Sequence, residues 1–485
     1  MTRLLHKINL IAVALCTTAV VVAANKYDTR IDGVYYTLQE GGLATVVTGD
    51  EKYAGDVTIP EEFDCAAGDF KVVAIAPKAF AGCKELRKIT YPASVTTIGE
   101  GAFAGCESLK EFAILENVTF IASSAFEGCV ALEEITIPAS VANIGDEVFK
   151  GCKALFSAVI ENKLIGENQF INCIHLDSVA ISENVTTIKK KAFARCSGLH
   201  KITIPASVAK IDAEVFSGCE QLEFADIQNM TVAEKQFAGC KRLQTVILSD
   251  TLTLIDRQAF ANCVGLTSFV TPMRLQVIRD EAFLNCSSLA TVELGNSLTH
   301  IGKKAFANCS TVEQLVIPNS IRTFGESTFQ GCKRLQSLVL DNACISEGEF
   351  QNCSSLQSIT FQTIPSRISK NAFSGCAALT SLELPEGVTI VEANAFHGCK
   401  GIESIVLPST IEQLGSGAFS GCAALHVIRC LAVQVPTTAN NVFSGIAKTD
   451  LKIEVPAASL EPYKLAAGWK GLQPKEGEVF FPIEQ

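Results

Sequence analysis

The stretch LEEITIPASVANIGDEVFKGC, residues 132–152, contains every feature on which the fold of this chain depends. Its first part, Leu-x-x-Ile-x-Ile, ends in alternating apolar residues, which is typical of a short strand with Ile135 and Ile137 pointing inward. The proline that follows ends the strand, because it has no amide hydrogen and a fixed φ. Residues 141–145 predict a second short extended piece. Residues 148–152 predict a turn or a single helical turn that leads to the next strand.

The Phe-x-x-Cys end of this stretch recurs along most of the chain. The step from one Phe to the next is 23 residues, apart from 21-residue steps after Phe149, Phe216 and Phe329 and a 24-residue step at the end. The last copy has Ile446 in place of Cys. One unit cannot bury its apolar face alone, whereas stacked units share a continuous core. The repeat therefore predicts a solenoid of about 17 coils.

The three 21-residue steps share a second feature. The pairs Glu161-Asn162, Gln228-Asn229 and Asp341-Asn342 replace the Pro-x pair after the strand. Asn tolerates left-handed backbone geometry, so a tighter turn at these positions can absorb the two missing residues. We interpret the shortening as neutral drift, with a local change of curvature as the alternative.

Sixteen of the 20 cysteines occupy the Phe-x-x-Cys slot. They are Cys83, Cys106, Cys129, Cys152, Cys173, Cys196, Cys219, Cys240, Cys263, Cys286, Cys309, Cys332, Cys353, Cys376, Cys399 and Cys422. Cysteine-rich exported proteins usually contain disulfides. Equivalent residues of stacked coils, however, have parallel Cβ vectors, and a disulfide requires vectors that converge. We therefore predict a structural column of buried, reduced thiols that donate weakly to backbone carbonyls. No Cys-x-x-Cys pair occurs and the six histidines are scattered, so no metal site is indicated.

The first residues predict a secretory signal peptide. A basic start precedes the apolar run 8–22, and small residues follow it, so we expect cleavage after residue 24. A lipoprotein anchored at Cys16 is the alternative, but Leu15 stands where a lipobox has a small residue. No later apolar run has the length of a membrane span. We expect an exported protein, secreted or at the cell surface, with no transmembrane segment in the mature chain.

The two ends of the mature chain depart from the repeat and predict caps. Strands on either side of residues 39–42 form a hairpin, and residues 57–60 and 72–75 look like degenerate repeat strands. At the other end, a last strand precedes a helical lid that contains Tyr463 and Trp469. Such ends cover the exposed core faces of a solenoid. The chain thus divides into a signal peptide, an N-terminal cap with degenerate repeats, the array and a C-terminal cap, at residues 1–24, 25–78, 79–446 and 447–485.

The repeated unit Ala-Phe-x-Gly-Cys-x-x-Leu-x-x-Ile-x-Ile-Pro-x-Ser-Val-x-x-Ile-Gly, which residues 80–99 carry, resembles the BspA-like class of leucine-rich repeats. The predicted fold is a leucine-rich-repeat solenoid, a β-rich right-handed superhelix with short parallel strands and helical or 3-10 turns, capped at both ends. The two ends also resemble those of proteins from anaerobic bacteria of the Bacteroides group. The resemblance implies secreted or surface proteins that adhere to host matrix proteins, host cells or other bacteria. It transfers no binding residues, because the partners of the family differ from member to member.

The composition and the motifs favour binding over catalysis. The net charge of −11 is spread along the chain, so no basic footprint for nucleic acid exists. No nucleophile signature, phosphate loop or zinc-ligand pattern occurs. We therefore predict a protein that is not an enzyme, has no cofactor and is monomeric.

The predicted binding surface is a stripe formed by the residue between the two inward positions of each strand. Its expected partner-binding part comprises Thr203, Ile247, Val270, Glu293, Val316, Val339, Thr360, Glu383 and Val406. An exposed row with so many apolar residues exceeds what solubility requires, although β-propensity alone also explains Val, Ile and Thr on strands. We expect an adhesin-like module that binds a host or bacterial protein. Glycan capture and a structural spacer are the alternatives, but sugar sites usually offer aromatic platforms, and the outward columns contain only Phe224.

The thiol column predicts the outcome of a thiol titration. Under denaturing, non-reducing conditions the mature chain should give close to 19 free thiols, because only Cys16 is removed with the signal peptide. A count of one or three would instead indicate a disulfide framework.

Overall fold

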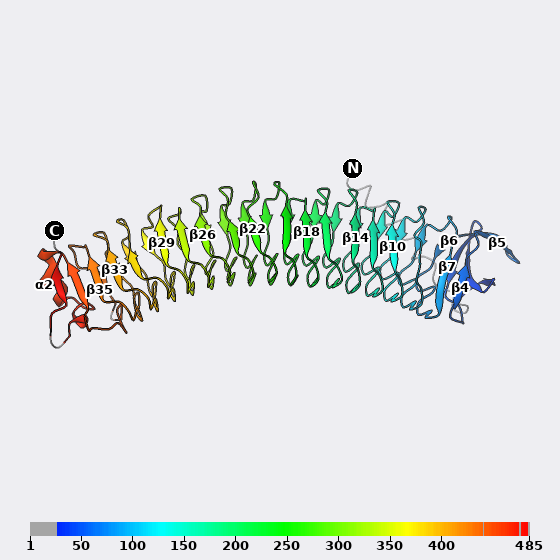
Figure 1. The fold of residues 1–485 in the computed structure, drawn as a ribbon. Coiled ribbons are helices and arrows are strands. Elements are labelled where there is room, and N and C mark those ends of the chain that lie inside the picture. The colour runs from blue at the N-terminus through cyan, green and yellow to red at the C-terminus, as the bar shows by residue number, and fades with distance from the viewer. Residues whose placement is uncertain (1–26, 440, 475–476, 484–485) are drawn as a thin grey trace.

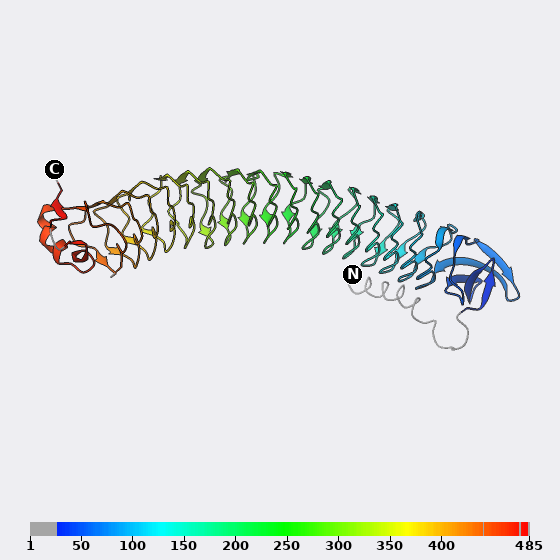
Figure 2. The ribbon, with the colours of Figure 1, turned by 60° about the horizontal axis from the view of Figure 1, so that its bottom comes forward.

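The computed structural model of this chain describes residues 27–439, 441–474 and 477–483. It is a long, gently curved rod of about 18 stacked turns, with the N-terminal and C-terminal caps at opposite ends, as Figure 1 and Figure 2 show. The predicted leucine-rich-repeat solenoid is confirmed. The predicted signal peptide lies outside the described residues.

Most coils contribute a first strand of three to five residues and a second strand of two residues. The first strands lie side by side along one face of the rod (Figure 1). They are β4 (Gly55–Thr58), β7 (Leu86–Thr90), β10 (Glu134–Ile137), β12 (Ser157–Ile160), β14 (Ser178–Ile181), β16 (Lys201–Ile204), β18 (Phe224–Ile227), β20 (Thr245–Leu248), β22 (Ser268–Val270), β24 (Thr291–Glu293), β26 (Gln314–Ile317), β28 (Ser337–Leu340), β29 (Ser358–Phe361), β31 (Ser381–Glu383), β33 (Ser404–Leu407), β35 (Val427–Cys430), β37 (Lys452–Val455) and β38 (Phe480–Pro482).

The second strands form another parallel ladder. They are β8 (Thr97–Ile98), β9 (Phe120–Ile121), β11 (Asn143–Ile144), β13 (Leu164–Ile165), β15 (Thr187–Ile188), β17 (Lys210–Ile211), β19 (Thr231–Val232), β21 (Leu254–Ile255), β23 (Val277–Ile278), β25 (His300–Ile301), β27 (Thr323–Phe324), β30 (Arg367–Ile368), β32 (Ile390–Val391), β34 (Gln413–Leu414) and β36 (Thr437–Thr438).

The repeated phenylalanines form a continuous column through the core. From Phe80 to Phe443, consecutive rings stack with centroids 4.9–5.7 Å apart and planes within 14° of parallel. Tyr53 packs on the first ring and Trp469 on the last, with centroid distances of 4.5 and 5.4 Å. The N–H of each Phe of the array, up to Phe419, donates to the carbonyl before the next Phe, at 2.7–3.0 Å. This turn ladder holds every coil to its neighbour.

The Phe-x-x-Cys segments are single turns, one of the two forms that the sequence predicts, each closed by a hydrogen bond from the Cys N–H to the Phe carbonyl, and they do not extend into helices. Within the described part of the array no residue is assigned to a helix. The reason is visible around Phe149, where Glu147 has φ 61° and Gly151 has φ 70°. Left-handed residues two places before and two places after the Phe recur along the array and interrupt any right-handed helix.

The first-strand face is not one continuous sheet but a series of short ones. The sheets are β4-β7, β10-β12-β14, β16-β18-β20, β22-β24, β26-β28-β29 and β31-β33-β35-β37-β38. Paired strands lie about 4.8 Å apart, whereas the Phe rings are spaced more widely. Two ladders of unequal pitch cannot both run unbroken along a rod that curves only gently, and the strand ladder is the one that breaks.

The size of the inward side chain helps to decide where strands pair. Two of the short units carry a small inward residue, Ala158 on β12 and Ala225 on β18, and both strands are the middle of a three-stranded sheet. Phe112 and Phe269 occupy the same slot in other coils. Residues 111–114 form no strand at all, and β22, which carries Phe269, is not paired with β20. The breaks beside Phe112 and Phe269 thus coincide with a large inward ring, although β22 still pairs with β24 on its other side, and a methyl group lets strands approach on both sides.

All three 21-residue units coincide with a change in strand pairing. Their first strands, β12, β18 and β28, are each the centre of a three-stranded sheet, and the second-strand ladder is interrupted at each of these units. The structure thus favours the local change of geometry over the neutral drift that the sequence suggested. Removing two residues from a unit thus tightens the first-strand ladder and breaks the second-strand ladder.

The proposed role of asparagine in the short units is wrong. Asn162, Asn229 and Asn342 do not have positive φ. They are buried, and the amides of Asn162 and Asn229 donate to the carbonyls of Leu164 and Thr231 at 2.7 and 2.8 Å. The side chain of Asn therefore closes the shortened turn, because its amide donates to the backbone carbonyl two residues further along the chain.

The N-terminal cap is an antiparallel meander that joins the array. Strands β1 (Thr29–Ile31), β2 (Val34–Gln39) and β3 (Leu43–Val47) are antiparallel neighbours, and β3 pairs in parallel with β6 (Gly68–Ile75). Strand β5 (Glu62–Cys65) forms a hairpin with β6. The strands β4 and β6 begin the first-strand and second-strand ladders by pairing with β7 and β8.

The C-terminal cap is a short helical segment followed by one more strand. It contains η1 (Ala457–Ser459), α2 (Leu460–Leu465) and η2 (Lys470–Leu472). Tyr463 and Trp469 are buried in it, with rings 5.0 Å apart at 84°. The strand predicted as the last, β37, pairs with a further strand, β38. The cap therefore covers the end of the core from two directions.

A substitution in the inward slot tests the link between side-chain size and strand pairing. Ala225→Phe should lower the free energy of unfolding by about 1–3 kcal/mol, because the added ring overpacks a buried strand that must lie close to its neighbours. Urea unfolding followed by circular dichroism measures the change. Ala180→Phe, on the exposed side of β14, is the control and should change stability by less than about 0.5 kcal/mol. Equal effects of the two substitutions would contradict the explanation.

Candidate protein-binding surface

The predicted stripe lies in register along the first-strand face. Thr203 pairs through Asp226 with Ile247, Val270 pairs with Glu293, and Val316 pairs through Val339 with Thr360. At the C-terminal end, Glu383, Val406, Arg429, Glu454 and Phe481 follow one another in register. Sheet breaks separate these groups, so the stripe consists of short rows on successive sheets.

Exposure along the stripe follows the strand pairing. Ile247, Val270 and Val316 have 51%, 55% and 55% of their surface exposed, which is high for large apolar side chains. Thr203, Glu293, Thr360 and Glu383 are exposed as well. Val339 and Val406 are less accessible, because they lie half-buried on closely paired strands. The accessible apolar part of the stripe is therefore concentrated between residues 247 and 316.

The charges on this part of the stripe are few. Among the described residues, Glu293 and Glu383 have no ion-pair partner within 4 Å. Arg429 lies 3.7 Å from Glu454, nearer the C-terminal cap. The region from Ile247 to Val316 thus presents apolar side chains around a single free carboxylate.

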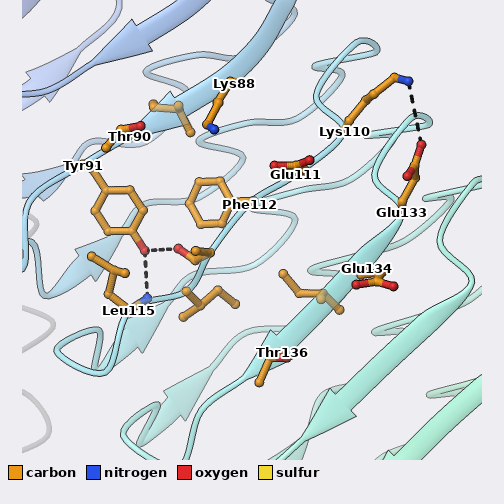
Figure 3. A pocket seen from close by; sticks show the side chains of 14 residues that line it. Lys88, Thr90, Tyr91, Lys110, Glu111, Phe112, Leu115, Glu133, Glu134 and Thr136 are labelled. Carbon is orange, nitrogen blue, oxygen red and sulfur yellow. Dashed lines mark hydrogen bonds and ion pairs between the residues drawn. The ribbon is translucent and has the colours of Figure 1, made fainter.

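A hollow of about 740 Å³ lies on the same face at its N-terminal end, between β7 and β10 (Figure 3). It is centred on residues 111–114, which form no strand. Phe112 forms part of its floor and stacks on Tyr91 with centroids 5.4 Å apart. Glu111 and Glu134 lie along it, and Lys110 and Glu133 form an ion pair at 3.9 Å at its edge. The hollow exists because the aromatic rings hold the strands apart.

The hydroxyl of Tyr91 replaces part of the missing strand pairing. It donates to the carbonyl of Ala113 at 2.7 Å and accepts a hydrogen bond from the N–H of Leu115 at 3.1 Å (Figure 3). Burial raises the pKa of Tyr91 to about 12, although the N–H of Leu115 opposes the shift. The hydroxyl therefore stays protonated at physiological pH and remains a donor.

Smaller hollows occur at two other breaks in the first-strand face. One of about 520 Å³ lies between β24 and β26, and one of about 280 Å³ lies beside Phe269, between β20 and β22. None of these hollows was expected from the repeat pattern. The signal for two of them is present in the sequence, because Phe112 and Phe269 occupy slots that hold Ile, Leu, Val or Ala in the other coils of the array.

The repeat assigns the chain to a family. A family model for the BspA type leucine rich repeat region, in six copies, matches residues 73–164, 160–266, 225–336, 253–364 and 343–463. Together the matches span well over half of the chain. The chain belongs to the BspA type leucine rich repeat family. Leucine-rich-repeat proteins are generally non-catalytic scaffolds that bind other proteins.

The chain is similar to solved leucine-rich repeat proteins, and the first of the three named here shares its fold over nearly the whole chain. A leucine-rich repeat protein from Bacteroides ovatus is 26% identical with a TM-score of 0.58, over 94% of this chain and 100% of that chain. A leucine rich cell surface protein from Faecalibacterium prausnitzii is 24% identical with a TM-score of 0.40, over 84% and 95%. The leucine rich repeat protein of T. pallidum is 29% identical with a TM-score of 0.35, over 40% and 90%. A search of curated proteins finds no match.

The cysteines of this BspA type array form a buried column beside the phenylalanines. All sixteen slot cysteines are buried. From Cys106 to Cys422, each thiol lies 3.1–3.6 Å from the carbonyl of the Phe of the preceding coil and donates to it. Burial raises the pKa of Cys129, Cys173, Cys219 and Cys286 to about 12. They are weak donors in the core and not nucleophiles.

The described residues also bear on metal binding and on membrane insertion. Among the described residues, no group of three or more His, Cys, Asp or Glu side chains is placed to hold a metal ion. In the same part of the chain, no helix is long and apolar enough to cross a membrane.

The hydroxyl of Tyr91 gives a test of the hollow. Tyr91→Phe should lower the free energy of unfolding by about 1–3 kcal/mol, because it leaves the Ala113 carbonyl and the Leu115 N–H without their partner. Tyr36→Phe is the matched control, since the buried hydroxyl of Tyr36 has no hydrogen-bond partner. Removing it should leave stability unchanged or raise it. Denaturant unfolding measures both, and a loss in Tyr36→Phe as large as in Tyr91→Phe would contradict the assignment.

Proposed function

We propose that this chain is an exported, non-catalytic, adhesin-like protein that binds a host or bacterial surface protein through the first-strand face of its array. The observation that carries the proposal is the exposure of Ile247, Val270 and Val316 on one face. Soluble proteins rarely leave apolar side chains grouped in this way unless the group meets a partner.

Three features of the face suit a protein partner. Its backbone is fixed by strand pairing and by the turn ladder, so binding does not have to order it. Its apolar centre carries few charges, as the buried centre of an interface requires. Its length allows contact over many coils, which is how curved repeat proteins bind their partners (Figure 1).

Export rests on the sequence alone, through the basic start and apolar run before residue 25. A protein partner is favoured over a glycan because aromatic residues are few in the outward columns: Phe224 is only partly exposed, and Phe481 stands on the last strand, β38, at the C-terminal cap. The proposal therefore names a protein surface as the ligand and the stripe between Ile247 and Val316 as its centre.

A binding screen on immobilised host matrix proteins and mucin glycans tests this function. The wild-type protein should bind at least one protein saturably. The double variant Val270→Lys/Val316→Lys should weaken that binding about tenfold or more, since it places two desolvated charges in the contact, and a loss of ~1.4 kcal/mol is tenfold in Kd.

The control carries the same two charges away from the stripe. Val264 and Val433 are 38% and 61% exposed and lie outside the first strands, so Val264→Lys/Val433→Lys should bind as the wild type does. Binding that both double variants lose equally, or that neither loses, would move the site to another face. Binding to glycans only would replace the proposed partner class.

A further inference from the structure

The third short unit differs from the other two at one buried position. The residue before the Phe is Gln169 in the first short unit, Gln236 in the second and Glu349 in the third. All three side chains are buried, with at most 1% of their surface exposed. A carboxyl group thus stands in the core where the matching coils have an uncharged amide.

The three side chains make the same hydrogen bond. The Oε1 atoms of Gln169 and Gln236 accept from the N–H groups of Gly166 and Ala233 at 2.5 and 2.7 Å. The Oε2 atom of Glu349 accepts from the N–H of Ser346 at 2.7 Å, and the Ser346 hydroxyl lies 3.3 Å away from it. Glu349 therefore occupies the role of a glutamine in this coil.

The other terminal atom is unpaired in all three coils. Gln169 Nε2, Gln236 Nε2 and Glu349 Oε1 are buried without a hydrogen-bond partner. In a protonated carboxyl this oxygen carries hydrogen, as the amide nitrogen does. In a carboxylate it would be a buried anionic oxygen with no donor, which is costly.

Among the described residues, no Lys, Arg or His forms an ion pair with Glu349 that would offset such a charge. On the turns of its own and the two flanking coils, the titratable groups are Glu326, Cys332, Glu347, Cys353, Lys370 and Cys376. Glu326 and Glu347 are held at 2.6 Å by Lys303 and Lys370 at the surface. The shift in the pKa of Glu349 comes from burial, which raises it to about 8, and the N–H and hydroxyl of Ser346 oppose it.

The same coil has a gap in its backbone pairing. In the first two short units, β13 and β19 begin a new second-strand ladder. In the third, residues 343–346 form no strand, and the ladder resumes only at β30. This coil also carries Cys344. Among the described cysteines outside the Phe-x-x-Cys slot, it is the one that is exposed. It therefore has fewer backbone bonds to its neighbours than the coils it resembles.

We propose that the coil of residues 341–350 is a pH-sensitive opening point in the array. While Glu349 carries its proton, the coil closes as the two glutamine coils do. Loss of that proton favours opening of the coil, because the carboxylate then reaches water. The inference concerns the array itself and does not depend on the proposed binding function.

The direction of the pH effect follows from the two states of the carboxyl. Its pKa is about 8 when the coil is closed and ~4.3 when it is open to water. Below the lower value both states are protonated and the closed coil is most stable. Between the two values the opening constant should rise up to tenfold per pH unit, and above the upper value it should level off.

Hydrogen exchange of the purified protein, followed by mass spectrometry at pH 5, 7 and 9, tests this. Rates are divided by the intrinsic exchange rate at each pH. The segment 341–353 should lose protection as the pH rises, while the segment 228–240 of the same molecule, with Gln236, should not. Glu349→Gln should remove the pH dependence and increase protection at pH 7 and 9.

The reverse substitution, Gln236→Glu, should give the segment 228–240 the same pH dependence. Protection of 341–353 that does not change with pH in the wild-type protein, or that changes equally in Glu349→Gln, would overturn the proposal. A folded Gln236→Glu protein without pH dependence would also count against it. If Gln236→Glu does not fold, the comparison of wild type with Glu349→Gln still decides the question.

Discussion

The contact on which this structure depends is the stacking of one phenylalanine ring on the next, together with the turn ladder beside it. Both run from one end of the array to the other, and the ladder contains no interruption between Phe80 and Phe419. From Phe80 to Phe396, the carbonyl of each Phe accepts twice, from the N–H of its own Cys and from the thiol of the next coil. Cysteine suits this slot because its side chain is small and apolar enough for the core, and its thiol is a weak hydrogen-bond donor.

The first-strand face adapts to the spacing that the column sets. Ala158 and Ala225 let strands pair, whereas Phe112 and Phe269 hold them apart and leave hollows. The shortened units tighten the first-strand sheets and interrupt the second-strand ladder, and the buried Asn and Gln or Glu side chains supply the hydrogen bonds that the shorter turn lacks. The rod thus combines a uniform core with a face whose shape changes from coil to coil, which is what recognition of one particular partner needs.

The sequence predicts the repeat, the solenoid and the family, because these depend on a pattern that each coil repeats. It fails where geometry arises between coils. A helical turn looks compatible with Val148-Phe149-Lys150-Gly151-Cys152, but the left-handed residues Glu147 and Gly151 exclude it. The buried amide of Asn162, the added strand β38 and the half-burial of Val339 all depend on how closely neighbouring elements approach. The outward position of each first strand could be identified from the sequence, but the division of these positions into short rows could not.

The measurement that tests this account most directly is residue-level hydrogen exchange of the free protein along the whole array at one pH. The account predicts uniform and high protection for the Phe amides of the turn ladder. It predicts uneven protection on the first-strand face, high for residues 157–160 and 224–227 and low for residues 111–114. Uniform protection of the first-strand face, or turn amides that exchange faster than the strands, would contradict it.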